Sequence, residues 1–111
     1  MDVSSFVDEL LSALTDIEFF EHVTLQTEGP VASGYAYVNE DLFLRFYFNQ
    51  VTGTIAFALI ESQQRVWGVD YDNRRGWHVH PVDKPTDHRL IAPLSITQIV
   101  GRLYKVLSDR M

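Results

Sequence analysis

The chain of 111 residues contains no cysteine, which excludes disulfides, thiol catalysis and zinc–thiolate sites. Its longest purely apolar run, Ile55–Ile60, is far shorter than the ~20 residues that a membrane-spanning helix needs. The first charged residue is Asp2, and no basic start precedes an apolar run of the kind that marks a signal peptide. We therefore expect a cytoplasmic protein with no membrane partner.

The composition that remains is that of one ordinary globular domain, residues 1–111. Apolar residues make up 46% of the chain and charged residues 22%, close to the averages for globular proteins. These fractions argue against a disordered chain and against a coiled coil. A chain of 12.8 kDa is large enough to bury one core and leaves little room for a second domain.

Basic residues are absent from the first 44 positions, and this shapes the choice of partner. That stretch holds nine acidic residues, whereas residues 45–111 hold all nine lysines and arginines and six acids. Affinity for phosphates comes mainly from cationic contacts, so the net charge of −6 disfavours non-specific binding to nucleic acid. The acids either lie on solvated faces or match a basic partner surface. In both cases we expect them to face away from RNA.

Hydrophobic periodicity predicts a helix, then strands, then a second helix. Apolar residues at three- and four-residue steps predict a helix over Ser4–Leu14, with Asp2, Ser4 or Ser5 as its N-cap. Ser95 and Gln98 form a capping box that predicts the start of the last helix. Three prolines predict an irregular segment over residues 81–94. The expected strands are Val23–Thr27, Tyr35–Val38, Leu42–Phe48, Thr54–Glu61, Arg65–Tyr71 and Trp77–Pro81.

The fold class that follows is α+β. Short strands joined by short turns predict an antiparallel meander sheet of five or six strands. Both helices are expected to pack on the sheet face formed by Leu42, Leu44, Phe46 and Phe48, the most apolar strand face in the chain. Arg45 points to the other face, which is left open to solvent or to a partner.

The sharpest chemical feature is the pair His78-x-His80. Residues two apart on a strand point to the same side, about 6.6–6.8 Å apart along the chain. Two such imidazoles can serve as acid and base on one phosphate, or hold a metal with a third ligand. They can also be polar residues on the solvent face of an edge strand, where Pro81 stops further pairing. The candidate third ligands are His88, Asp83, Asp87, Asp70 and Asp72.

The turn before this strand brings Arg74 and Arg75 close to the pair. Planar guanidiniums at a hairpin tip suit a phosphate, although a merely solvated turn explains them equally well. The register of the hairpin stays open. A four-residue loop places Tyr71 opposite His78, whereas a five-residue loop places Asp72 opposite His78 and Asp70 opposite His80.

Three features of the chain occur together: the stretch Tyr71-Asp72-Asn73, the His78-x-His80 pair that follows it, and the order of a helix, a meander and a final helix. In this combination the chain resembles the TumE-type toxin family of prokaryotic toxin–antitoxin pairs. That family typically shows an Arg-Tyr-Asp-Asn stretch and then a Pro-His-His-x-His-like segment. Here Asp70 replaces the Arg, Trp77 replaces a His or Pro, and four residues separate Asn73 from His78. The resemblance implies a toxin that acts through RNA and is neutralised by a protein antitoxin.

We therefore expect a toxin-like ribonuclease that works without a metal or other cofactor. His78 and His80 are expected as acid and base, Arg74 and Arg75 as phosphate ligands, and Tyr71 as a positioning group. The expected partners are an antitoxin and RNA. Two alternatives stay open: a non-enzymatic interaction module that binds a protein on its open sheet face, and a small metal-binding domain built on the His-x-His strand.

Overall fold

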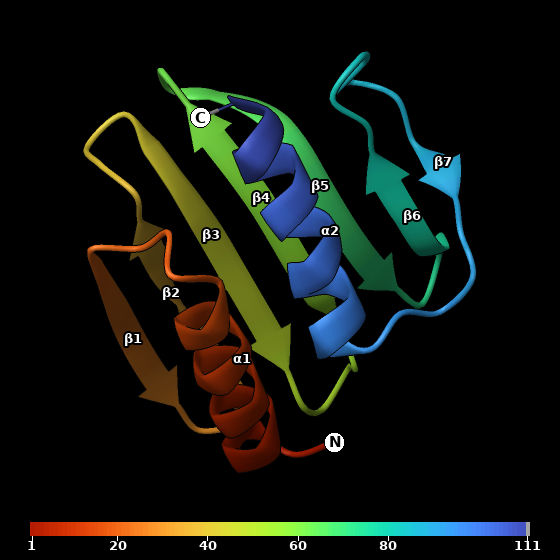
Figure 1. The fold of residues 1–111 in the computed structure, drawn as a ribbon. Coiled ribbons are helices and arrows are strands. Elements are labelled where there is room, and N and C mark those ends of the chain that lie inside the picture. The colour runs from red at the N-terminus through yellow and green to blue at the C-terminus, as the bar shows by residue number, and fades with distance from the viewer. Residues whose placement is uncertain (111) are drawn as a thin grey trace.

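The computed structural model describes residues 1–110, in which two helices pack on one face of a seven-stranded antiparallel sheet (Figure 1). The strands follow one another across the sheet in chain order, as a meander requires. The α+β class is thus confirmed. The elements are α1 (Val3–Ile17), β1 (His22–Glu28), β2 (Val31–Tyr37), β3 (Leu42–Asn49), β4 (Ile55–Glu61), β5 (Gln64–Asp72), β6 (Gly76–His80), β7 (Arg89–Leu90) and α2 (Ile96–Arg110).

The strand count is seven rather than five or six, and the additional strand is β7. It lies in the segment whose prolines predicted irregular structure. Arg89 and Leu90 are free of proline and pair with Val79 and His78 of β6. A two-residue strand carries too little alternation to be recognised in a sequence. Its presence means that β6 is an inner strand and not the edge of the sheet.

The helices begin as predicted, and α1 runs one turn further. The Asp2 carboxylate accepts a hydrogen bond from the backbone N–H of Ser5 at 2.7 Å, and α1 ends where Glu18 adopts the left-handed conformation. The capping box of α2 is reciprocal. Ser95 N–H donates to Gln98 Oε1 at 2.8 Å, and Gln98 N–H donates to Ser95 Oγ at 3.1 Å.

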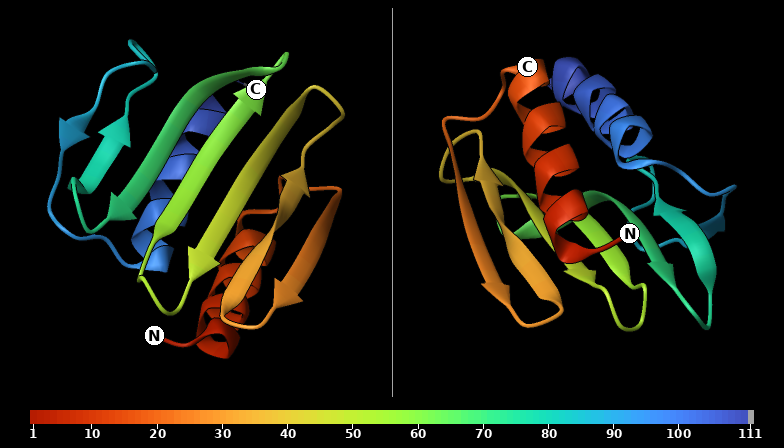
Figure 2. Two further views of the ribbon diagram at one scale, coloured as in Figure 1. Left: turned by 180° about the vertical axis from the view of Figure 1, so that it is seen from behind. Right: turned by 90° about the horizontal axis from the view of Figure 1, so that it is seen from below.

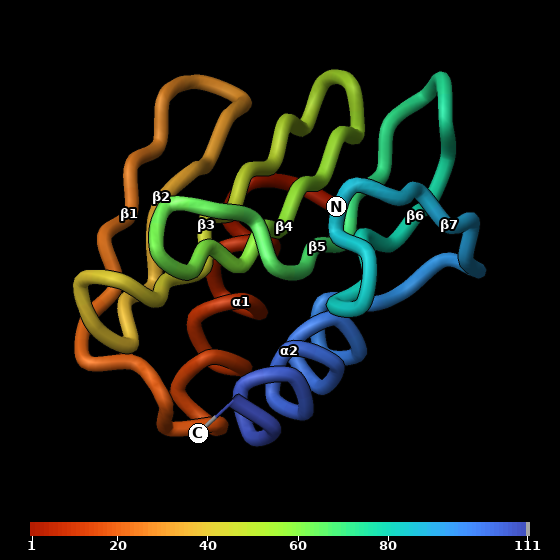
Figure 3. The backbone as a smooth tube through the Cα atoms, turned by 90° about the horizontal axis from the view of Figure 1, so that it is seen from above, coloured from red at the N-terminus to blue at the C-terminus, as the bar shows by residue number. Residues whose placement is uncertain are grey.

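Both helices cover the same face of the sheet, as predicted (Figure 3). The ring of Phe6 on α1 stacks on Phe48 of β3 with centroids 4.7 Å apart, and it lies 6.2 Å from Phe57 of β4. Trp67 is also buried in this core. The remaining buried side chains of the helices are Leu10, Leu14, Ile96, Ile99, Val100, Leu103 and Leu107.

The opposite side of the sheet, here called the open face, carries no helix (Figure 2). Strand pairing aligns its side chains in rows that cross the sheet. One row consists of Thr24, Tyr35, Arg45, Ala58, Gly68 and His80. The next consists of Gln26, Ser33, Tyr47, Ala56, Asp70 and His78. The chemistry-bearing residues of β5 and β6 therefore share one face with the arginine and tyrosines of β2 and β3.

The acidic residues of the first 44 positions all lie exposed, as predicted. That they face a basic partner stays a prediction. Among the described residues no helix is long and apolar enough to cross a membrane.

Candidate functional site

The β5–β6 hairpin is closed by a tighter turn than either predicted loop. Asp72 Oδ1 accepts the backbone N–H groups of Arg75 at 2.8 Å and Arg74 at 2.9 Å, and Gly76 follows with φ of 71°. The hydrogen bond from the Arg75 N–H has the largest effect on the pKa of Asp72 and lowers it, and the bond from the Arg74 N–H lowers it further. Both predicted registers are wrong: Asp70 lies opposite His78, and Gly68 lies opposite His80.

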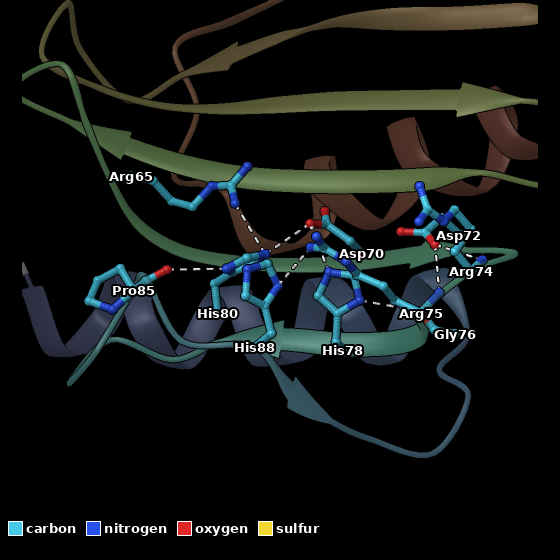
Figure 4. A network of polar contacts seen from close by, with 10 residues as sticks. All are labelled: Arg65, Asp70, Asp72, Arg74, Arg75, Gly76, His78, His80, Pro85 and His88. Atoms are coloured by element: carbon cyan, nitrogen blue, oxygen red, sulfur yellow. Dashed lines mark hydrogen bonds and ion pairs between the residues drawn. The ribbon is translucent and has the colours of Figure 1, made fainter.

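His78 and His80 share one side of β6 on the open face, as their spacing predicted. The interpretation of the pair as exposed residues on the solvent face of an edge strand is wrong, because only 2% of His78 and 3% of His80 is accessible to solvent. β7 pairs with the outer edge of β6, and Pro85 and His88 of the segment between these strands lie against the rings (Figure 4). The backbone carbonyl of Pro85 in that segment meets the His80 ring.

The two buried rings are fixed in orientation by backbone carbonyls. His78 Nδ1 donates to the Gly76 carbonyl at 3.2 Å, and His80 Nδ1 donates to the Pro85 carbonyl at 3.1 Å. A carbonyl oxygen can only accept, so each Nδ1 carries a proton, and in the neutral form of each ring the lone pair is on Nε2. Both Nε2 atoms face the same oxygen, Asp70 Oδ2, at 3.4 Å from His78 and 3.0 Å from His80.

His88, from the segment before β7, adds a third ring. Its centroid lies 5.2 Å from that of His78 and 4.5 Å from that of His80. One nitrogen from each of the three rings lies within 4.8 Å of the other two. Desolvation, followed by the nearby positive groups, lowers the pKa of His88 and so favours its neutral ring. We call His78, His80, His88 and Asp70 the histidine cluster.

Two arginines border the histidine cluster. Arg65 Nη1 donates to His80 Nε2 at 3.1 Å, and Arg75 Nη1 donates to His88 Nδ1 at 3.3 Å. Arg75 is thus beside the cluster, as the sequence suggested, while Arg74 is exposed at the hairpin tip. A hollow opens over the cluster, and it is lined by Gln64, Arg65, His80, Pro85, Thr86 and His88.

Sequence reasoning missed Arg65, because a β-bulge determines where its side chain points. The pairing of β4 with β5 shifts between Leu59 and Ile60, so that Leu59 faces Trp67 while Ile60 faces Arg65. Val66 is the extra residue. Without the bulge, strict alternation from the buried Trp67 would have turned Arg65 toward the helices. The sequence holds no clear signal for a bulge at this position.

The structure separates Tyr71 from the histidines. Asp70 and Tyr71 are consecutive on β5, so Tyr71 points to the side that carries the helices, where its ring lies 5.3 Å from that of Trp77. Its hydroxyl donates to Asn73 Oδ1 at 3.2 Å.

The structure also sorts the five candidate third ligands. Asp83 and Asp87 each pair with Arg89 at 3.3 Å, and Asp72 closes the turn. His88 and Asp70 remain as the groups that meet His78 and His80.

The geometry disfavours the expected acid–base pair and suits a metal. An acid and a base must flank the reacting phosphate, whereas His78 Nε2 and His80 Nε2 both point at one carboxylate oxygen. In the neutral forms of the rings, the lone pairs on these nitrogens and on Asp70 Oδ2 repel one another, and either a proton or a metal ion among them removes the repulsion. Hydrogen bonds from Nδ1 to backbone carbonyls are typical of metal-binding histidines. Asp70 Oδ1 is moreover buried with no hydrogen-bond partner among residues 1–110.

Comparison of the chain with protein-family models, with curated proteins and with solved structures finds no significant match. The histidine cluster must therefore be interpreted from its own geometry.

Proposed function

We propose that the histidine cluster binds a divalent transition metal, with one nitrogen each from His78, His80 and His88 and an oxygen from Asp70 as ligands. The observation that carries this proposal is the convergence of three imidazole nitrogens within 4.8 Å, two of them on rings fixed through Nδ1 and facing Asp70. This proposal replaces the mechanism expected from the sequence, in which His78 and His80 act as acid and base without a metal.

The donor set favours zinc or a neighbouring ion such as cobalt or nickel. Imidazole and carboxylate ligands suit these metals, and the chain has no thiolate to compete. Zinc–nitrogen bonds of about 2.0–2.1 Å in a tetrahedral site set ligand nitrogens roughly 3.3 Å apart. The rings therefore need a small contraction, which His88 can supply because it is the exposed one of the three.

The two arginines support chemistry on an anion. Arg65 and Arg75 place two positive charges next to a centre that contains one carboxylate. Such a centre binds a cation better when an anion such as a phosphate is bound beside it. Zinc can expand to five ligands, so a metal held by the histidine cluster would supply a bound water of lowered pKa as the nucleophile for phosphorus. Arg65 and Arg75 would hold the phosphate, and the leaving oxygen would take a proton from solvent. We propose hydrolysis of a phosphodiester as the reaction class.

This reaction class supports the wider expectation of a toxin that cleaves RNA in the cytoplasm and is neutralised by an antitoxin. The specific observation in favour of it is the position of Arg65 and Arg75 at the open side of the cluster. Growth inhibition on expression, reversed by a protein antitoxin, is the outcome that this proposal requires.

Metal binding is tested by calorimetric titration of the chelator-treated protein with zinc, and by the visible spectrum of the cobalt form. We expect one equivalent to bind and the spectrum to show nitrogen and oxygen ligands. His88→Ala removes an exposed ligand and should abolish binding while the protein stays folded. His22→Ala is the matched control, because His22 lies on β1 against Tyr37. Binding that is absent, or equal in both variants, overturns the proposal.

The reaction is tested separately, by incubating labelled RNA with the protein under zinc and under chelator. We expect cleavage that requires the metal and that is lost in His88→Ala. Cleavage that survives complete removal of the metal restores the metal-independent mechanism. Zinc binding without cleavage or growth inhibition overturns the toxin proposal and leaves a metal-binding interaction module.

A further inference from the structure

A second hollow, of about 570 Å³, lies on the open face beside the histidine cluster. Its floor is made by small side chains at the centre of the sheet, Ala56 and Ala58 on β4. The hollow forms because these alanines are much smaller than their neighbours in the same rows, Tyr47 and Arg45 on β3. We call it the alanine hollow.

Arginines stand on both sides of the alanine hollow. Arg45 on β3 lies directly beside Ala58 in the register, and Arg65 enters from β5 because of the bulge. β3 and β5 are two strand spacings apart, about 9.5 Å, so two long side chains can both reach one anion above Ala58. The described lining residues of this hollow include no carboxylate. The nearest acid in the register is Asp70, which faces the histidines.

Aromatic rings form the other border of the alanine hollow. Tyr47 and Tyr35 line it directly. Tyr35 also belongs to a set of four neighbouring rings on the open face of β1, β2 and β3, with centroids 4.6 to 5.9 Å apart: His22, Tyr35, Tyr37 and Phe43. Tyr35 retains 39% of its accessible surface, so a flat ligand can stack on this set.

We infer that the alanine hollow binds a nucleoside phosphate, with the phosphate between Arg45 and Arg65 and the base against Tyr35 and Tyr47. Planar guanidiniums recognise a phosphate through paired hydrogen bonds, and tyrosine rings recognise a base by stacking. The small floor of Ala56 and Ala58 leaves room for the sugar. Apart from Arg65, the proposed ligands of the phosphate and the base lie on β2 and β3, which do not pair with β5 or β6, so the inference does not rest on the metal.

The hollow and the histidine cluster are nevertheless continuous. Arg65 lines the alanine hollow and also donates to His80 Nε2. In the register, Ala56 lies next to Asp70, and Ala58 is followed by Gly68 and then His80. A phosphate held by Arg65 is thus placed on the side of the hollow that borders the cluster.

The inference is tested by calorimetry on chelator-treated protein with adenosine monophosphate, adenosine and ribose phosphate. We expect adenosine monophosphate to bind, and the other two to bind at least tenfold more weakly, because each lacks one half of the recognition. Equal binding of ribose phosphate and adenosine monophosphate would overturn the stacking contact. Absence of any binding would overturn the whole inference.

Variants locate the binding site. Arg45→Ala should weaken binding of adenosine monophosphate at least tenfold, and Ala56→Leu should block it by filling the floor, with circular dichroism to verify the fold. Arg102→Ala is the matched control, because Arg102 is an exposed arginine on α2, on the other side of the sheet. Equal losses in Arg45→Ala and Arg102→Ala would contradict a local site.

Two further titrations distinguish nucleotide binding in the alanine hollow from metal binding in the histidine cluster and identify the kind of nucleotide. His88→Ala should keep full affinity for the nucleotide while losing zinc, so that failure of one site is visible without failure of the other. A short single-stranded oligoadenylate distinguishes the source of the nucleotide unit. Tighter binding than that of the mononucleotide assigns the hollow to a unit within a strand, and equal binding assigns it to a free nucleotide.

Discussion

Asp70 holds a position that few carboxylates in a folded protein occupy. Its Oδ2 faces two imidazole nitrogens at 3.0 and 3.4 Å, while Oδ1 is buried without a hydrogen-bond partner among the described residues. Buried polar atoms are nearly always satisfied, and an exception points to a function or to a bound group. A metal at Oδ2 explains the convergence of the lone pairs, whereas two imidazolium–carboxylate ion pairs are the purely structural alternative.

Substitution of Asp70 by Asn distinguishes these two explanations. The amide is nearly isosteric but neutral, so we expect zinc affinity to fall at least about tenfold. The amide N–H can donate to a histidine lone pair, so the melting temperature of the metal-free protein should not decrease. Calorimetry and thermal unfolding in chelator provide the two measurements. A lower melting temperature with unchanged zinc affinity would favour the ion pairs and contradict the metal site.

At the scale of elements, the β5–β6 hairpin determines which side chains meet. A loop longer by one residue would shift the pairing of β6 by one position and move the histidines away from Asp70. The turn is fixed by Asp72, which accepts two backbone N–H groups, and by Gly76 in the left-handed region.

Gly76→Ala tests the importance of this turn. With φ at 71°, an alanine there is strained even though its methyl group meets open space, so we expect a loss of about 1 kcal/mol in the free energy of unfolding. Gly101→Ala is the matched substitution inside α2, where the added methyl group also meets nothing. It should stabilise the protein by about 0.5–1 kcal/mol, because alanine is the better helix former. Urea unfolding measures both, and equal signs would contradict the argument.

The end of α2 is held to the sheet by an ion pair between Arg110 and Glu61 of β4. The hydrogen bond from Arg110 lowers the pKa of Glu61 below its ordinary 4.5. The pair therefore contributes its full stability above pH 4.5 and loses it as the pH falls through the lowered pKa. We expect Arg110→Gln to unfold more easily than the wild type at pH 7, with a difference that shrinks below pH 4.5. Urea unfolding across this range checks the trend, and a constant difference would contradict it.

The sequence predicted those elements that local chemistry determines. Alternation over Leu42–Phe48 and the capping box at Ser95 each lie within a few residues, and both features are present in the structure. It did not predict the features that depend on partners distant in the chain. The bulge that turns Arg65 to the open face requires the pairing of β4 with β5, and the burial of His80 requires the segment at Pro85 to fold back.

At the scale of the whole molecule, the acidic net charge is not spread evenly over the surface. The acids of α1 are exposed on the helix side, while the alanine hollow on the open face is lined by Arg45 and Arg65 and by no carboxylate among its described lining residues. A net charge of −6 therefore does not describe the surface that an anionic ligand meets. The alanine hollow and the histidine cluster occupy neighbouring parts of that surface and share Arg65.

A metal in the histidine cluster would join three separate parts of the chain, namely β5 through Asp70, β6 through His78 and His80, and the segment before β7 through His88. Because zinc would bind the folded state and not the unfolded one, free zinc at 100 times its dissociation constant should stabilise the protein by about 2.7 kcal/mol. For a domain of this size that corresponds to a rise of about 10 °C in the melting temperature. We expect this rise in the wild type and in His22→Ala, its absence in His88→Ala, and its reversal by chelator. Thermal unfolding followed by circular dichroism measures it, and an equal rise in His88→Ala would mean that zinc stabilises the protein from a different site.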